Sequence, residues 1–176
     1  MDPLALPFDR DDMLARLRPW IECESPTWDA DAVTRMMDLA ARDAEGWGCT
    51  VDRIPPAGGF GGSIRIRVPH PDHGRVKGVL VSGHMDTVHP AGVLEKNPWR
   101  VEGGKAWGPG IQDMKGGNFA MLEAARLLHA AGARTPLPVT FLFTPDEEVG
   151  TPATRTLIED EARRNAAVLL PEPALR

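Results

Sequence analysis

Three short apolar runs, each followed closely by acidic or histidine residues, constrain most strongly how this chain can fold. The runs cover residues 78–81, 139–143 and 167–170. Because they are largely apolar on both faces, they are typical of central strands in a sheet that helices cover on both sides. Such strands are usually parallel to one another, with helices as the connections between them.

The rest of the chain alternates helical and extended patterns. Helical spacing of apolar residues covers 9–23, the stretch from Asp29 or Asp31 to about 45, 114 to about 131, and 152–164. Two further strands are expected at 50–54 and 63–68, and residues 88–110 are rich in turns. The sequence therefore predicts an α/β fold: a three-layer sandwich with a mainly parallel sheet and helices on both faces.

Composition excludes several classes of function. The formal net charge of -5 at pH 7 leaves no basic surface for nucleic acid. No apolar run reaches the length of a membrane span, and residues 1–7 lack the features of a secretory signal peptide. Cys23 and Cys49 are too few for a disulfide framework. We therefore expect a cytoplasmic protein with free thiols and with no nucleic-acid or membrane partner.

Acidic residues and one histidine gather where the expected strands end. His84 and Asp86 follow the first run, Glu147 and Glu148 the second, and Glu172 the third. The carboxyl ends of parallel strands open on one crevice, so these side chains are expected to lie together. Several carboxylates at close range cannot all stay ionised without a cation. One imidazole with several carboxylates suits zinc, cobalt or manganese.

Each motif also has an ordinary structural interpretation when it is taken alone. His84 could be a satisfied core histidine, and Asp113 could cap the helix that starts after it. Glu147 and Glu148 could complement the N-terminus of the next helix, and Glu172 could be a surface residue. The shared position at strand ends favours a metal site over these separate interpretations.

The spacing of residues within the His84–Asp86 and Glu147–Glu148 motifs suggests a separate role for each residue. On an extended backbone His84 and Asp86 face the same way, so Asp86 can accept the second imidazole N–H and fix the tautomer. Adjacent Glu147 and Glu148 point in different directions, so one can bind metal while the other acts on water as a general base. His89 is a candidate contact at the rim of the site, against the alternative of a plain loop residue.

Taken in order, the motifs resemble those of the M20 family of metallopeptidases. The matching segments are residues 24–27 (ESPT), GHMDTV, GIQDMKGG, DEEVGTP and the closing EPA, which together cover essentially the whole chain. The resemblance implies a zinc-exopeptidase-like fold and hydrolysis of a peptide or amide bond in a small peptide or N-acyl amino acid. It favours a carboxypeptidase-like exopeptidase, with an N-acyl amino-acid deacylase or desuccinylase as the alternative.

The resemblance also implies a role for each residue. His84, Asp113 and Glu172 correspond to the ligands of one metal ion. Asp113 and Glu148 correspond to ligands of a second ion, so that Asp113 bridges the two. The expected cofactor is two zinc ions in the complete enzyme, with Co²⁺ or Mn²⁺ possible.

Two catalytic positions complete this set. Glu147 corresponds to the general base that acts on a metal-activated water, and Asp86 to the residue that orients His84. The peptide bond that follows Asp113 is cis in members of the family.

Two features depart from the family pattern. Gly108-Pro109-Gly110 stands where GRG is usual, and the last metal ligand of the family is a histidine well beyond Glu172. The resemblance thus implies that residues 1–176 are the N-terminal portion of a catalytic domain, without the C-terminal part or the lid domain. We expect this chain alone to bind one metal ion well, a second poorly, and to turn over little substrate. A homodimer is expected only for a full-length chain, and a non-catalytic metal-binding fragment is the alternative.

Overall fold

A mixed sheet of five strands forms the centre of the fold over residues 5–174, the part of the chain that the computed structural model describes. The description leaves out residues 1–4 and residues 175–176. The prediction that the N-terminal segment is not a signal peptide falls partly on residues 1–4, outside the described residues. The strands of the central sheet are β1 (Thr50–Ile54), β2 (Ser63–Arg67), β3 (Val79–His84), β6 (Val139–Thr144) and β7 (Ala167–Leu169). Strands β4 (Arg100–Glu102) and β5 (Lys105–Trp107) form a separate two-stranded sheet. The helices are α1 (Arg10–Glu22), α2 (Ala30–Glu45), α3 (Val93–Lys96), α4 (Gly116–Ala130) and α5 (Arg155–Arg164), with shorter turns η2 (Ile111–Lys115) and η3 (Glu147–Val149).

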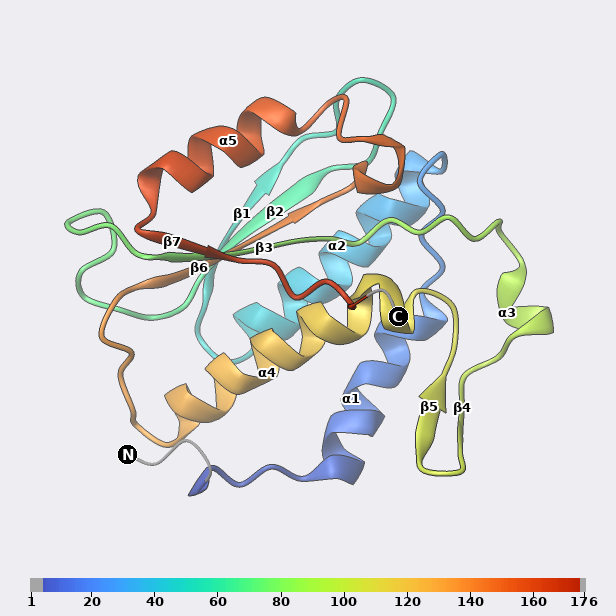
Figure 1. The fold of residues 1–176 in the computed structure, drawn as a ribbon, viewed down its shortest axis with the longest axis horizontal. Helices are drawn as coiled ribbons and strands as arrows, with labels where there is room; N and C mark the ends of the chain where they lie inside the picture. The colour runs from blue at the N-terminus through green and yellow to red at the C-terminus, as the bar shows by residue number, and fades with distance from the viewer. Residues whose placement is uncertain (1–4, 175–176) are drawn as a thin grey trace.

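The strand order places the three strands predicted to be central side by side, and for β3 and β6 that prediction is confirmed. For residues 167–170 it is wrong: β7 lies at the edge of the sheet and its residues are exposed, because within residues 5–174 no further strand covers its outer side. The order is β1-β2-β6-β3-β7, and β3 is parallel to both β6 and β7. In contrast, β1 and β2 are antiparallel to their neighbours. Figure 1 shows α5 on one side of the sheet and α2 and α4 on the other. The predicted α/β fold with helices on both faces is confirmed, and the sheet is parallel in the part that carries the candidate residues.

The spacing of apolar residues along a helix determines which of its faces packs on the sheet. In α2, Val33, Met36 and Ala40 belong to a fully buried stripe, and the Asp29 carboxylate caps the helix by accepting the N–H of Ala32. This helix packs on β1 and β2. Burial of its stripe removes apolar surface from water, which is the dominant favourable term in folding.

Aromatic side chains join α1 and α4 to the sheet. The ring of Trp20 in α1 meets Phe119 of α4 edge-on at 5.5 Å and Phe143 of β6 at 6.5 Å between centroids. Edge-to-face geometry at these distances is favourable beyond the area that it buries. None of the helices within residues 5–174 is both long and apolar enough to cross a membrane.

The turn-rich segment 88–110 contains structure that the sequence does not predict. It forms the short helix α3 and the β4–β5 hairpin, whose turn places Gly103 and Gly104 at positive φ. The guanidinium of Arg100 lies over the ring of Trp107 at 4.9 Å. Strands of three residues are too short to produce a recognisable alternation, which explains why periodicity misses them.

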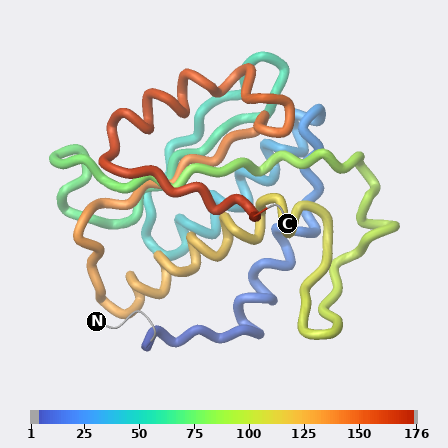
Figure 2. Tube along the Cα trace, viewed as in Figure 1, coloured from blue at the N-terminus to red at the C-terminus, as the bar shows by residue number. Residues whose placement is uncertain are grey.

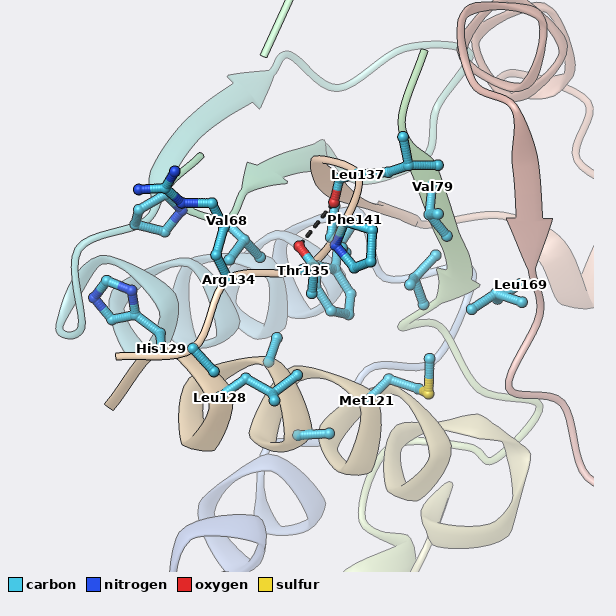
Figure 3. A pocket seen from close by; sticks show the side chains of 17 residues that line it. Val68, Val79, Met121, Leu128, His129, Arg134, Thr135, Leu137, Phe141 and Leu169 are labelled. Atoms are coloured by element: carbon cyan, nitrogen blue, oxygen red, sulfur yellow. Dashed lines mark hydrogen bonds between the residues drawn. The ribbon is translucent and has the colours of Figure 1, made fainter. Parts of the chain in front are cut away.

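An apolar groove of about 390 Å³ lies between α4 and the sheet, near the first residues of β3 and β6 and away from the carboxyl ends of these strands. Figure 3 shows Met121 and Leu128 of α4 on one side of it, Val79 and Phe141 of the sheet on another, and Leu169 of β7 nearby. Among residues 5–174, those that line it include no acidic side chain. Although this groove is apolar and well formed, it lacks the convergent polar groups of a catalytic site.

After β7 the chain continues in the direction of the strand towards the start of α4. Figure 2 shows this last segment passing the N-terminal end of that helix. Gly117 allows the close approach, because a Cβ at this position would overlap the carbonyl oxygen of Pro171. Glu172 is thereby brought to the end of α4 that adjoins η2.

Gly83 in β3 is expected to tolerate no side chain. A Cβ at this position would overlap the Oδ1 atom of Asn118 in α4. Gly83→Ala should therefore lower the free energy of unfolding by about 1–3 kcal/mol through overpacking, measured by urea denaturation. Gly46→Ala is the matched control, because Gly46 has φ -60° and its nearest neighbour would lie 3.3 Å from the new Cβ. Equal stabilities of the two variants would contradict the close packing of β3 on α4.

Candidate metal centre

The predicted site residues reach one edge of the sheet from four segments of the chain. His84 is the last residue of β3, Glu147 lies in η3 directly after β6, and Glu172 follows β7. Asp113 lies in η2, immediately before α4. Parallel strands end at the same edge, so local strand direction alone accounts for three of these four positions.

A buried imidazole nitrogen lies at the centre of this cluster. His84 Nε2 is 3.1 Å from Asp113 Oδ1, 3.6 Å from Glu147 Oε2 and 3.7 Å from Glu172 Oε1. The His84 side chain is 1% exposed, whereas the three carboxylates are about half exposed or somewhat less. The cluster is therefore open to solvent on the side of the carboxylates.

Three of these side chains have the spacing that a cation requires. One ligand atom from each of His84, Asp113 and Glu172 lies within 4.8 Å of the others. With metal–ligand bonds of about 2.1 Å, two ligand atoms on one tetrahedral ion lie roughly 3–4 Å apart. One nitrogen and two carboxylate oxygens at these separations fit a zinc ion or a similar divalent cation after small side-chain adjustments.

Glu148 lies outside this group of three. Together with Asp113 it lines an adjacent cavity of about 410 Å³, to which His89 and Trp107 also contribute. Burial, with the negative charges of Asp113 and other carboxylates, raises the pKa of Glu148. The structure thus places Glu148 beside Asp113 and places His89 on the wall of the neighbouring cavity.

Asp86 fixes the imidazole of His84 from the buried side. His84 Nδ1 lies 3.0 Å from the carbonyl oxygen of Asp86 and 3.2 Å from its Oδ1. Both atoms can only accept, so Nδ1 carries the proton and Nε2 faces the carboxylates. The backbone N–H groups of Glu147 and Glu148 also donate to the Asp86 carboxylate, at 3.3 Å each.

The charges around His84 favour a positive charge at Nε2. Burial alone would lower the pKa of His84, but the hydrogen bond and charge of Asp86, with the negative charges of Glu147 and Glu172, raise it to about 9. Burial, opposed by His84 and aided by neighbouring carboxylates, also raises the pKa of Glu172. Either a proton or a metal cation at Nε2 relieves this crowding of negative charge.

Three polar residues that sequence reasoning missed support the cluster. Asn118 Nδ2 donates to the carbonyl oxygen of His84 at 2.7 Å. Asp146 is fully buried and accepts N–H bonds from Ala153 at 2.7 Å and Thr154 at 3.1 Å, which closes the loop after Glu147 and Glu148. In the sequence, these supporting residues are marked only by their position inside or beside a motif that contains a candidate site residue.

Lys115 is the third of these residues and is also buried. Its Nζ donates to the carbonyl oxygens of Cys23 at 2.8 Å and Trp20 at 3.2 Å, at the C-terminal end of α1. Burial lowers the pKa of Lys115 to about 8. This contact ties η2, which carries Asp113, to the end of a helix whose carbonyl groups lack backbone partners.

Comparison with known sequences places the motifs in a family. Residues 80–175 match the family model described as peptidase family M20/M25/M40. Carboxypeptidase G2 from Pseudomonas sp. (strain RS-16) is 37% identical over 166 residues, which cover 92% of this chain and 38% of the relative. A succinyl-diaminopimelate desuccinylase from Helicobacter pylori (strain G27) is 35% identical over 97 residues, covering 53% of this chain and 24% of the relative.

Solved structures show the same fold. Human carnosine dipeptidase 1 superposes with a TM-score of 0.74 at 21% identity, covering 91% of this chain and 38% of its own. An M20 family metallo-carboxypeptidase from Sulfolobus solfataricus gives a TM-score of 0.74 at 18% identity, covering 96% and 38%. The chain thus spans about 38% of the length of these proteins and of carboxypeptidase G2. Since the family model matches more than half of its residues, the chain belongs to peptidase family M20/M25/M40.

Proposed function

We propose that the protein takes part in hydrolysis of a peptide or amide bond at a metal centre formed by His84, Asp113 and Glu172. The observation that carries this proposal is a buried imidazole nitrogen with three carboxylates within 3.7 Å. Members of the family are hydrolases that act on such bonds. Without a cation, this many acidic side chains around one nitrogen would repel one another.

The donor set supports zinc, with Co²⁺ or Mn²⁺ as alternatives. One imidazole and two carboxylates would hold the first ion, and Asp113 with Glu148 would hold a second. When bound, a divalent cation polarises a substrate carbonyl and lowers the pKa of a water molecule. The open side of the cluster, where the carboxylates are exposed, is where substrate would enter.

We assign the proton transfers to Glu147. Its Oε2 lies 3.6 Å from His84 Nε2, and its backbone N–H is fixed on Asp86. From this position the carboxylate would accept a proton from water as the water attacks the carbonyl carbon, and would then donate it to the leaving nitrogen. Asp86 would keep Nδ1 of His84 protonated, so that Nε2 stays directed at the cation.

We propose a carboxypeptidase-like exopeptidase rather than a desuccinylase. The matched share of this chain is 92% for carboxypeptidase G2 and 53% for the desuccinylase. The substrate would be a small peptide or an N-acyl amino acid. The free thiols of Cys23 and Cys49 support a cytoplasmic location, where thiols stay reduced, and homodimerisation of a full-length chain stays a prediction.

Asp113→Ala tests the metal centre directly. After loading with zinc and removal of free ion, elemental analysis of the wild-type chain should find about one equivalent or more, because the site forms from this chain's own residues. Asp113→Ala should lose it. Asp72→Ala is the matched control, since the Asp72 side chain is 48% exposed and the Asp113 side chain 55% exposed. Equal zinc content in wild type and Asp113→Ala would contradict the proposed site.

Glu147→Gln tests the general base. Where hydrolysis of C-terminal glutamyl peptides or N-acyl amino acids is measured, this variant should lower kcat by about 10²–10⁴-fold, because glutamine cannot accept a proton. Its zinc content should stay at the wild-type level. Glu148→Gln is the matched control and should lower the occupancy of the second ion. An unchanged kcat in Glu147→Gln would remove Glu147 from the proposed role.

The affinity for zinc should depend on pH. His84 must release the proton on Nε2 before that atom can bind a cation. Because the fold raises the pKa of His84 from 6.5 to about 9, proton and cation compete throughout that interval, and affinity should rise as the pH rises through it. Calorimetric titration in buffers of different ionisation enthalpy measures both the affinity and the protons released. An affinity that stays constant over the interval would show that Nε2 is not a ligand.

A further inference from the structure

The ESPT motif, residues 24–27, has no role in the mechanism described above. In the structure this segment runs beside the residues that follow β3. Thr27 N–H donates to the carbonyl oxygen of Thr87 at 3.2 Å, and Thr87 N–H donates to that of Ser25 at 2.9 Å. The Ser25 hydroxyl donates to the carbonyl oxygen of Met85 at 2.6 Å. Residues 25–27 are therefore fixed along the segment that carries Asp86.

The residues just before this stretch are held by separate contacts. The Glu24 carboxylate accepts the N–H groups of Gly92 at 2.7 Å and Leu94 at 2.8 Å. The carbonyl oxygen of Cys23 accepts from Lys115 Nζ at 2.8 Å. None of these contacts involves a candidate metal ligand. The position of the segment is thus set by the fold and not by the side chains of the metal centre.

One side chain of the motif reaches Asp86. The Thr27 hydroxyl donates to Asp86 Oδ2 at 2.8 Å, while the carbonyl oxygen of Thr87 lies further away at 3.3 Å. Thr27 is 3% exposed and Asp86 is fully buried. Hydrogen bonds to a buried charged acceptor are among the strongest in proteins, and a lost donor leaves that charge undersatisfied.

The Thr27 contact is the shortest of those that the Asp86 carboxylate makes. The N–H groups of Glu147 and Glu148 lie 3.3 Å from Oδ1 and Oδ2, and His84 Nδ1 lies 3.2 Å from Oδ1. These three donors belong to the metal centre itself. The hydroxyl of Thr27 comes from outside it and fixes the rotation of the carboxylate about its Cβ–Cγ bond.

We propose that Thr27 is a positioning residue of the metal centre and acts through Asp86. By fixing the carboxylate it sets the plane of the His84 imidazole and the position of the η3 turn that carries Glu147 and Glu148. This inference rests on the proposed function, since it assumes that His84 binds a cation. In this proposal, residues 24–27 hold the Thr27 hydroxyl within hydrogen-bond distance of the buried Asp86 carboxylate.

Two substitutions separate the hydroxyl from the shape of the side chain. Thr27→Val keeps the shape and removes the donor, whereas Thr27→Ser keeps the donor and removes the methyl group. The probe is Co²⁺, whose visible absorption reports the geometry of its ligands, with affinity measured by competition against a chelator. We expect Thr27→Val to bind Co²⁺ about 10-fold more weakly, as is typical when a group that orients a ligand is lost. Its spectrum should change, and Thr27→Ser should match wild type in both measurements.

The outcomes distinguish this inference from the proposed function. Equal Co²⁺ affinity and spectrum in wild type and Thr27→Val would overturn the positioning role while leaving the metal centre intact. Loss of affinity in Thr27→Ser as large as in Thr27→Val would also overturn it, because packing and not the hydroxyl would then matter. Wild-type protein that binds no more Co²⁺ than Asp113→Ala would refute the proposed function itself.

Stability is measured in parallel on the metal-free proteins. Urea denaturation identifies the variants that are folded before Co²⁺ is added. Should Thr27→Val not fold, Thr27→Ala replaces it, since Thr27→Ala and Thr27→Ser differ by the hydroxyl oxygen alone. The expected result is then weaker binding and an altered spectrum in Thr27→Ala only, and identical Co²⁺ binding by the pair overturns the proposal.

Discussion

The buried carboxylate of Asp86 joins parts of the chain that are far apart in sequence. A charge with no exposure to water is tolerated only where donors surround it, and the donors here come from three different segments. The Thr27 hydroxyl precedes α2, the His84 imidazole ends β3, and the N–H groups of Glu147 and Glu148 follow β6. Satisfying this one charge therefore places the groups of the candidate centre relative to one another before any cation arrives.

The direction of the strands also contributes to the position of the candidate site residues. Because β3, β6 and β7 run parallel, their last residues open on the same edge, and the polar groups that follow them meet there. The antiparallel strands β1 and β2 extend the sheet on the far side of β6 and support α2. The apolar groove of Figure 3 lies elsewhere, between α4 and the sheet. Its volume of about 390 Å³ is close to the 410 Å³ of the cavity beside Asp113 and Glu148, so cavity volume does not distinguish the two places. Chemistry is the better guide, because hydrolysis requires converging polar groups.

The periodicity of apolar residues was sufficient to predict the five sheet strands and the four long helices. The positions of His84, Glu147 and Glu172 directly after predicted strands were sufficient to predict that these three side chains lie close together. Prediction failed where structure depends on contacts between distant residues. The β4–β5 hairpin is too short to show a period. Nothing local marks Lys115 as buried or Thr27 as a donor to Asp86, because each contact spans about sixty residues or more. Asp113 was found only through its motif, since η2 follows no central strand.

The edge strand β7 has a consequence for how long a bound ion would stay. Glu172 follows a strand of three residues that pairs with β3 alone within residues 5–174, and all three residues are exposed. Edge segments of this kind open locally at a far lower free energy than the core. Detachment of residues 167–172 would remove the Glu172 carboxylate from the proposed ligand set while His84 and Asp113 keep their places. Fraying of this strand would then set the dissociation rate of an ion held there, and metal exchange would become a measure of local opening.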